Sequence, residues 1–305
     1  MPYYRQEYYS AIQRMLELTD NILLQDKMPI DDKHNVGARI LRHGLAVSAF
    51  ALLEKYTRSI FDAMVNDMNN STLLYHEFPD RLRKFISVDA IGGLNNTLYF
   101  IKDDLAKFAF VDTHLPRLSG YASSTPTYTA FGFSSSGSNV GHDDIKKGFA
   151  AFGLTDAWGK MSLIASDIGG GTLSLENEFR GLARARHMSA HEPASNIPTT
   201  TLQSHLKAAI LLGITIDILA SDLGGAIRNC GKKADLPIVV SAVAHSYRFL
   251  DEQIDGSWLE RASAAGRGVK RLPDKDMAVQ SALQRKSSSH IVVRDAASFP
   301  RELIR

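Results

Sequence analysis

Apolar positions recur every three or four residues along much of the chain, which is the period of one face of an α-helix. The first such stripe comprises Tyr8, Ile12, Met15, Thr19 and Ile22, and Met28-Pro29 is expected to end that helix. A longer helix is predicted over residues 36–68, with a stripe made of Ile40, His43, Val47, Phe50, Glu54, Thr57, Phe61, Met64 and Met68. Shorter helical pieces are predicted over residues 80–86 and 96–108.

The second half of the helical region is interrupted by a polar segment. In residues 119–142, 14 of 24 positions are Gly, Ser or Thr, which predicts a long loop that is a lid, a binding loop or an insert. A helix is expected to begin near Ser174, with Glu176 and Glu178 in its first turn, and to stop at Pro193. After a capping box at Thr200-Gln203, the next long stripe consists of Leu202, Leu206, Ala209, Gly213, Ile216, Ala220 and Leu223.

Beyond Gly231 the pattern changes. Residues 237–243 and 290–293 are predicted to be strands, because they are short apolar runs rich in β-branched residues, while residues 276–284 are predicted to be helical. The chain is therefore expected to have a mainly α fold, with a helical domain over residues 1–231 and a small α+β region over residues 232–305.

Composition narrows the class of protein. With 44% hydrophobic and 22% charged residues, the chain is typical of a globular protein. The single cysteine, Cys230, excludes an intramolecular disulfide and a cysteine-based zinc cluster. There is no basic-then-apolar leader at the N-terminus and no apolar run near the roughly 18 residues of a membrane span. These features predict a cytoplasmic protein that does not associate with membranes.

The net charge of +2 is unevenly distributed. Residues 228–305 carry 14 Lys and Arg against 9 Asp and Glu, whereas residues 1–227 carry 21 against 24. A basic C-terminal region can help to hold nucleic acid, and a solvated surface explains the same excess equally well.

The segment from Arg184 to Pro193 concentrates the chemistry of the chain. Arg184, Arg186, His187 and His191 place permanent cations beside groups that exchange protons near neutral pH. A phosphodiester uses both, through charge stabilisation on its oxygens and proton transfer at a ribose hydroxyl. The alternative is a helix that ends in basic residues because these complement its dipole.

Arg186 followed by His187, with His191 five residues after the arginine, resembles the signature of the HEPN superfamily of all-α ribonucleases and ribonuclease-derived domains. The stretch from Leu52 to Tyr56, which contains Glu54, is similar to the Leu-Glu-x-Tyr stretch of its RiboL-PSP branch, and residues 145–154 resemble another segment of that branch. The resemblance covers about residues 1–228. It implies a HEPN-like antiparallel helical bundle.

The resemblance also implies an activity, namely metal-independent endoribonuclease cleavage in a toxin or phage-defence system. Two copies would face each other, with His191 as general acid or base, Arg186 stabilising phosphate charge and His187 in support. RNA is the implied substrate, an antitoxin or defence-system protein an implied partner, and neither cofactor nor metal is expected. The alternative is a catalytically silent HEPN-like module that dimerises or binds RNA or a partner.

Two questions stay open at this level. Arg186 and His191 are roughly 140° apart on an ideal helix, whereas Arg184 and His191 are nearly aligned, so that distortion before Pro193 or a second subunit would have to close the first angle. The family signature favours Arg186 as the catalytic residue and leaves Arg184 to bind RNA. Glu54 interrupts an apolar stripe, and either it pairs with Arg186 or it reaches water from the stripe's edge.

Other motifs are weaker. The turn from Asp167 to Thr172 resembles the phosphate-binding turn of actin-like ATPases, but that turn lies between two strands and helices are predicted on both sides here. The loop from Gly137 to Asp144 lacks the spacing of an EF-hand. HEPN toxins that are paired with nucleotidyltransferase antitoxins usually carry Tyr three residues after the His, where this chain has Ala194.

Overall fold

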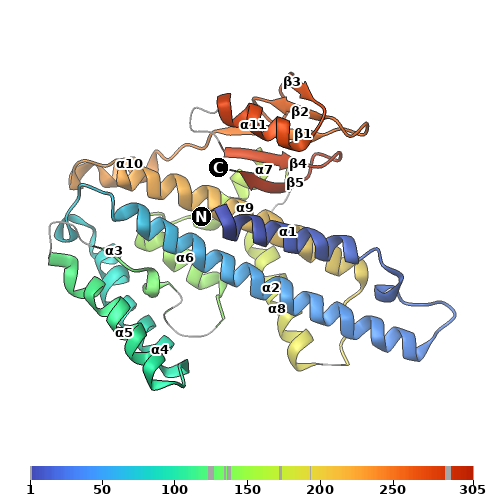
Figure 1. Ribbon diagram of the computed structural model, residues 1–305, viewed down its shortest axis with the longest axis horizontal. Helices are drawn as coiled ribbons and strands as arrows, with labels where there is room; N and C mark the ends of the chain where they lie inside the picture. The colour runs from blue at the N-terminus through green and yellow to red at the C-terminus, as the bar shows by residue number, and fades with distance from the viewer. Residues whose placement is uncertain are drawn as a thin grey trace. The chain divides into compact units, whose positions relative to one another are not determined.

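The computed structural model describes residues 2–122, 127–133, 135, 139–171, 174–192, 194–285 and 290–304. The described chain is mainly helical with a small C-terminal sheet, as predicted (Figure 1). Its contacts divide into two compact units built from separate stretches, which do not follow a boundary at residues 231 and 232. Unit 1 comprises residues 1–56, 158–218 and 245–305, and unit 2 comprises residues 57–157 and 219–244.

The helices of unit 1 follow the apolar stripes in part, because the first helix ends at Leu18 and not at Met28-Pro29 as predicted. They are α1 (Pro2–Leu18), η1 (Ile22–Leu24), α7 (Ala157–Asp167), α8 (Leu175–His191) and the unit's shares of α2 (Asp32–Met68) and α9 (Thr199–Arg228). Every predicted stripe residue of α9 is buried, but Ile22 and Ile40 are exposed, contrary to prediction. Gly213 is required by packing, because a Cβ there would lie 2.5 Å from the Tyr8 ring.

A buried ion pair joins α1 to α9 inside unit 1. Asp217 interrupts the apolar sequence of α9, and its carboxylate accepts hydrogen bonds from Arg5 Nε at 2.7 Å and Arg5 Nη2 at 3.0 Å. The Tyr56 hydroxyl donates to the same carboxylate at 2.5 Å, and burial raises the pKa of Tyr56 well above its ordinary value. Tyr56, part of the Leu-Glu-x-Tyr stretch, therefore anchors α2 to this pair.

The sheet of unit 1 has the strand order β3-β2-β1-β4-β5, with β1 and β4 parallel and the other neighbours antiparallel. Its elements are β1 (Tyr247–Glu252), β2 (Trp258–Arg261), β3 (Gly268–Leu272), α11 (Lys275–Arg285), β4 (His290–Arg294) and β5 (Pro300–Ile304). Leu250, Leu272 and Ile291 pack with Ala278 and Ala282 of α11 into a separate small core. The predicted helix and the strand at 290–293 are confirmed.

The predicted strand at residues 237–243 is wrong, because Leu236–Ser241 forms the short helix α10 of unit 2. Pro237 occupies the first turn of that helix, where its missing N–H costs nothing. Unit 2 also contains η2 (Tyr75–Glu77), α3 (Asp80–Lys84), the π-helix η3 (Phe85–Asp89), α4 (Ala90–Phe100), α5 (Asp104–Ser119), η4 (Gly120–Ala122), η5 (Ala130–Gly132), α6 (His142–Ala151), η6 (Lys233–Asp235) and the remaining parts of α2 and α9.

Aromatic rings form the centre of unit 2. Phe61 stacks on Phe133 with ring centroids 4.0 Å apart and also contacts Phe149. Gly148 allows this approach, because a Cβ there would lie 2.7 Å from Phe61. The predicted loop over residues 119–142 thus contributes η5 and Phe133 to the core, while residues 123–126, 134 and 136–138 lie outside the described residues.

Two described helices, α2 and α9, are long and apolar enough to cross a membrane when judged by length and composition alone. This corrects the expectation that no segment approaches that length. The apolar window of α9 is 78% buried and that of α2 is 39% buried. Core helices of soluble proteins pass the same test, so the finding is weak evidence for a membrane span.

Candidate functional site

The helix that carries the arginines and histidines begins where the sequence predicts. Ser174 is the N-cap of α8, and its hydroxyl accepts a hydrogen bond from the backbone N–H of Asn177 at 3.4 Å. Glu176 and Glu178 lie in the first turn, where the helix dipole favours negative charge. Pro193 lies outside the described residues, and α8 ends at His191. The bounds of α8 therefore match the prediction.

The two long faces of α8 differ in chemistry. Leu175, Phe179, Leu182 and Ala185 are buried, and the Phe179 ring packs against Phe50 of α2 and Trp158 of α7. On another face, three residues are all exposed and follow one another at helical spacing: Arg184, His187 and His191. The imidazole rings of His187 and His191 have centroids 4.8 Å apart. The structure therefore groups one guanidinium with two imidazoles on one solvent-facing strip.

Arg186 does not belong to that strip. It is half buried, on the flank of the apolar face. Because α8 stays α-helical through His191, no distortion of the helix closes the roughly 140° between Arg186 and His191. The geometry within one chain thus groups His191 with Arg184, which the family signature had assigned to RNA binding.

The predicted ion pair between Glu54 and Arg186 is not formed. Within the described part of the chain, the Arg186 guanidinium makes neither a hydrogen bond nor an ion pair. Glu54 is half buried and makes other polar contacts. Glu54 therefore gives no support to Arg186 in this structure.

A second set of basic residues lies on α2, next to the chain that follows α8. Arg42 is almost fully buried and donates to the Leu24 carbonyl at 2.6 Å, to Asp26 at 3.0 Å and to the Asn196 side chain at 2.8 Å. His43 contacts the backbone of Ser195. These contacts tie residues 195–196, and with them the end of α8, to α2.

His43 is buried beside two cations. Burial lowers the pKa of His43 below its ordinary value of 6.5, and the charges of Arg39 and Arg42 lower it further. The apolar stripe of the sequence includes His43 but not Arg39 or Arg42. The signal available for them was the three basic side chains within five positions of an otherwise apolar helix.

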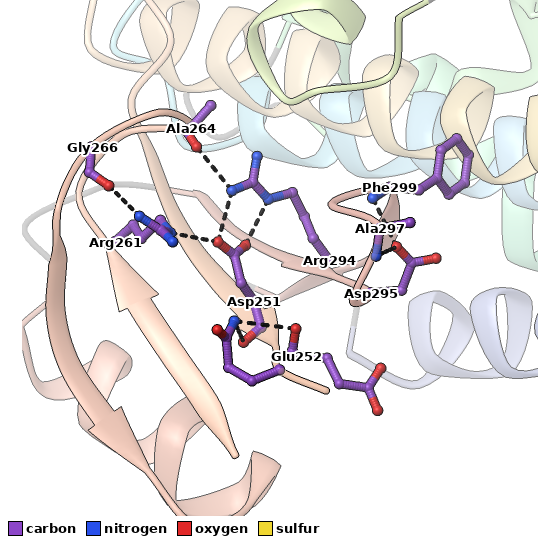
Figure 2. Close-up of polar contacts among 10 residues, drawn as sticks. Asp251, Glu252, Arg261, Ala264, Gly266, Arg294, Asp295, Ala297 and Phe299 are labelled. Atoms are coloured by element: carbon purple, nitrogen blue, oxygen red, sulfur yellow. Dashed lines mark hydrogen bonds and ion pairs between the residues drawn. The ribbon is translucent and has the colours of Figure 1, made fainter. Parts of the chain in front are cut away.

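The C-terminal sheet contains a further cluster of arginines, shown in Figure 2. Arg294 Nε and Nη2 donate to the two oxygens of Asp251 at 2.7 and 2.9 Å, and Arg294 Nη2 also donates to the Ala264 carbonyl. Arg261 Nε donates to Asp251 at 2.7 Å, and its Nη1 reaches the Gly266 carbonyl. Asp251 and Arg294 are almost fully buried. Because the fold itself supplies the acceptors for both guanidinium groups, this cluster has a structural role.

The glycine-rich turn between α7 and α8 is explained by packing. A Cβ at Gly170 would lie 2.6 Å from Leu211, and one at Gly169 would lie 3.2 Å from the Ser298 carbonyl. Gly169 and Gly171 also have positive φ angles of 93° and 63°, which side chains disfavour. The flanking elements are helices, as the sequence predicts, and Thr172 lies outside the described residues. The likeness to a phosphate-binding turn is therefore not accompanied by the strands which that motif requires.

Over the described ranges, no three His, Cys, Asp or Glu side chains gather as a metal site would need. Comparison of the chain with protein-family models, curated proteins and solved structures finds no match. The exposed strip of α8 is thus the candidate site, on the strength of its own chemistry.

Proposed function

We propose that this chain is a metal-independent endoribonuclease whose site is the strip formed by Arg184, His187 and His191. The observation that carries the proposal is the exposure of two neighbouring imidazoles and one guanidinium on a single helix face. Imidazoles are the side chains best suited to exchange protons at neutral pH, and a guanidinium binds phosphate oxygens through paired donors.

The chemistry needs no other group. One imidazole accepts the proton of a ribose 2′-OH as its oxygen attacks the adjacent phosphorus. The second imidazole donates a proton to the departing 5′-oxygen, so that the phosphodiester is cut and a 2′,3′-cyclic phosphate is left on one fragment. Arg184 stabilises the negative charge that develops on the non-bridging oxygens in the transition state.

The wider setting follows from the HEPN resemblance and belongs to the same proposal. The mainly helical fold, with the Arg/His segment near the end of α8 between the long helices α2 and α9 in chain order, supports this resemblance. We place the activity in a cytoplasmic toxin or phage-defence system, with a second copy of the chain and an antitoxin or defence protein as partners. Ala194 argues against silencing through a tyrosine at that position.

The second candidate is a HEPN-like module that binds RNA or a partner without cutting. The separation of Arg186 from His191 favours it, because the pair in the family signature does not converge within one chain. In that case the strip on α8 would bind phosphates and the histidines would contribute charge alone.

Purified full-length protein incubated with total RNA in EDTA tests the first proposal. We expect fragments that end in 2′,3′-cyclic phosphate, and a rate reduced about 10²- to 10⁴-fold in His191→Ala, the usual contribution of one general acid or base. His76→Ala removes an exposed histidine of unit 2 and serves as the matched control. RNA that is bound but left intact would support the second candidate, and a His191→Ala variant that cuts at the wild-type rate would exclude the proposed site.

A further inference from the structure

The helix α5 of unit 2 is covered on one side only, where Phe110 and His114 contact the Phe131 ring. All sixteen of its residues, Asp104–Ser119, are described, and none of them is buried. Three of its large apolar side chains point into solvent, with Leu105 76% exposed, Phe108 63% and Leu115 58%. A helix of this length owes its stability in water to packing of an apolar face. The exposed face of α5 therefore lacks the partner that would stabilise it.

The neighbouring helix enlarges this surface. Ile91, Tyr99 and Phe100 of α4, and Val88 just before it, are also more than half exposed. Between α4 and α5 runs an apolar groove of about 190 Å³, lined by Ile91, Leu94, Leu98, Phe110, Val111 and Leu118 among others. Together the seven exposed side chains offer on the order of 700 Å². That area is close to the roughly 800 Å² that each partner buries in a stable protein–protein interface.

The charges on α4 and α5 distinguish a protein partner from an anionic membrane surface. Residues 90–119 carry Lys102, Lys107 and Arg117 against Asp103, Asp104 and Asp112, so the hairpin has no net charge. An anionic membrane surface attracts helices that are rich in lysine and arginine, which this hairpin is not. The acids Asp103 and Asp104 lie at the start of α5 and Arg117 lies at its end. This order of charges favours pairing with a second α5 helix that runs in the opposite direction.

We propose that the α4–α5 surface binds the same surface of a second copy of this chain, with the two α5 helices antiparallel. The apolar residues Leu105, Phe108 and Leu115 lie on one face of α5 at helical spacing, and Asp112 lies among them on the same face. In an antiparallel pair Leu105 faces Leu115 of the partner, and Phe108 lies beside the partner's Asp112 position. Arg117 then reaches the acids at the start of the partner helix.

This interface differs from a contact at the Arg/His strip and does not depend on the proposed RNA cleavage. Sedimentation velocity of the full-length protein is expected to show a dimer at micromolar concentration. Leu105→Glu together with Phe108→Glu should yield a monomer with an unchanged circular dichroism spectrum, since both side chains are solvent-exposed in one chain. Ile254→Glu, at a 98% exposed site in unit 1, is the control and should remain dimeric.

Charge reversal tests the antiparallel order. Arg117→Glu should weaken the dimer at least tenfold, and adding Asp104→Arg should restore it. A Leu105→Cys/Leu115→Cys variant should form an intermolecular disulfide under mild oxidation, because the chain's own Cys230 is buried. A wild-type monomer, a dimer that survives the double Glu substitution, or one that is cross-linked through Arg184→Cys instead would overturn the proposal. So would binding of the hairpin to lipid vesicles in place of self-association.

Discussion

Arginines occur in two contrasting settings in unit 1. In the C-terminal sheet, Arg261 and Arg294 converge on Asp251, and Arg294 also lies 4.4 Å above the centre of the Phe249 ring. On α8, Arg184 is exposed beside two exposed histidines. The guanidinium groups of Arg261 and Arg294 donate to a carboxylate inside the fold, whereas the guanidinium of Arg184 faces solvent. The contrast shows that a structural arginine is distinguished from a ligand-binding one by whether the fold supplies its acceptors.

The backbone produces this difference. Parallel pairing of β1 and β4 places Asp251 directly opposite Arg294, and antiparallel pairing of β1 and β2 places Arg261 opposite Phe249, two residues before Asp251 on the same face. On α8, Glu176 accepts a hydrogen bond from Arg180 at 2.7 Å, whereas the neighbours of Arg184 at helical spacing include the basic residues Arg180 and His187 and no acid. A sheet can therefore neutralise its own arginines, while the exposed face of α8 presents them to a ligand.

Removing the acceptor from the sheet cluster should have the largest effect. We predict that Asp251→Ala lowers the free energy of unfolding by about 3–5 kcal/mol, because two guanidinium groups lose their buried counter-charge. Urea denaturation of the full-length protein measures this loss. Asp255→Ala is the matched control, since its side chain is 59% exposed and its partner Arg271 is also on the surface. A loss no greater than that of the control would mean that the cluster does not stabilise the sheet.

Prediction from the sequence succeeds for the helices α8 and α9 and fails for most strands of the same sheet. The bounds of α8 and the stripe of α9 were predictable because capping residues and helical periodicity are local signals. The sequence does not predict the strands β1, β2, β3 and β5. Four of the five residues of β3 are exposed, and buried Asp251 in β1 and buried Glu260 in β2 break the apolar alternation that reveals a strand. Their burial depends on partners far away in the chain, as with Arg248 and Arg285, which both contact Glu260.

The candidate site was predictable in composition but not in grouping. The cluster from Arg184 to His191 was evident, whereas the choice between the two arginines depends on whether α8 stays regular up to His191. The Glu54–Arg186 pair was inferred from two interrupted stripes on separate helices, and no local signal says how such stripes face each other. Tertiary packing decides that, and the exposure of Ile40 reflects the same limit.

Replacing Arg184 and Arg186 of α8 one at a time should have the next largest effect. We predict that Arg184→Ala lowers the rate of RNA cleavage about 10²-fold or more, because Arg184 shares the exposed strip with His191 and supplies the charge-stabilising donor. Arg186→Ala should alter the rate much less, since it lies on the flank of the helix. Single-turnover cleavage at saturating protein separates this effect from RNA affinity. A larger loss of rate in Arg186→Ala than in Arg184→Ala would favour Arg186 as the catalytic arginine, as the family signature does. It would also point to a site completed by a second chain.

The smallest predicted effect compares a half-buried histidine beside α8 with the exposed strip of that helix. His205 of α9 packs against α8 at Gly181, where a Cβ would lie 3.3 Å from the imidazole. Burial lowers the pKa of His205 below its ordinary value of 6.5. The unfolded chain therefore takes up a proton before the folded chain does, so stability is complete above pH 6.5 and declines as the pH falls from 6.5 toward the lowered pKa.

His205→Gln should remove this part of the pH dependence, which amounts to at most about 1 kcal/mol after allowance for partial exposure of the ring. The measurement is the difference in unfolding free energy between wild type and variant at pH 7.5 and at pH 5.5. Between pH 7.5 and 8.5 the two proteins should change in parallel, which serves as the internal control. Equal slopes over the acidic range would mean that the folded protein accommodates a charged His205. The buried side of α8 would then tolerate positive charge as readily as its exposed strip.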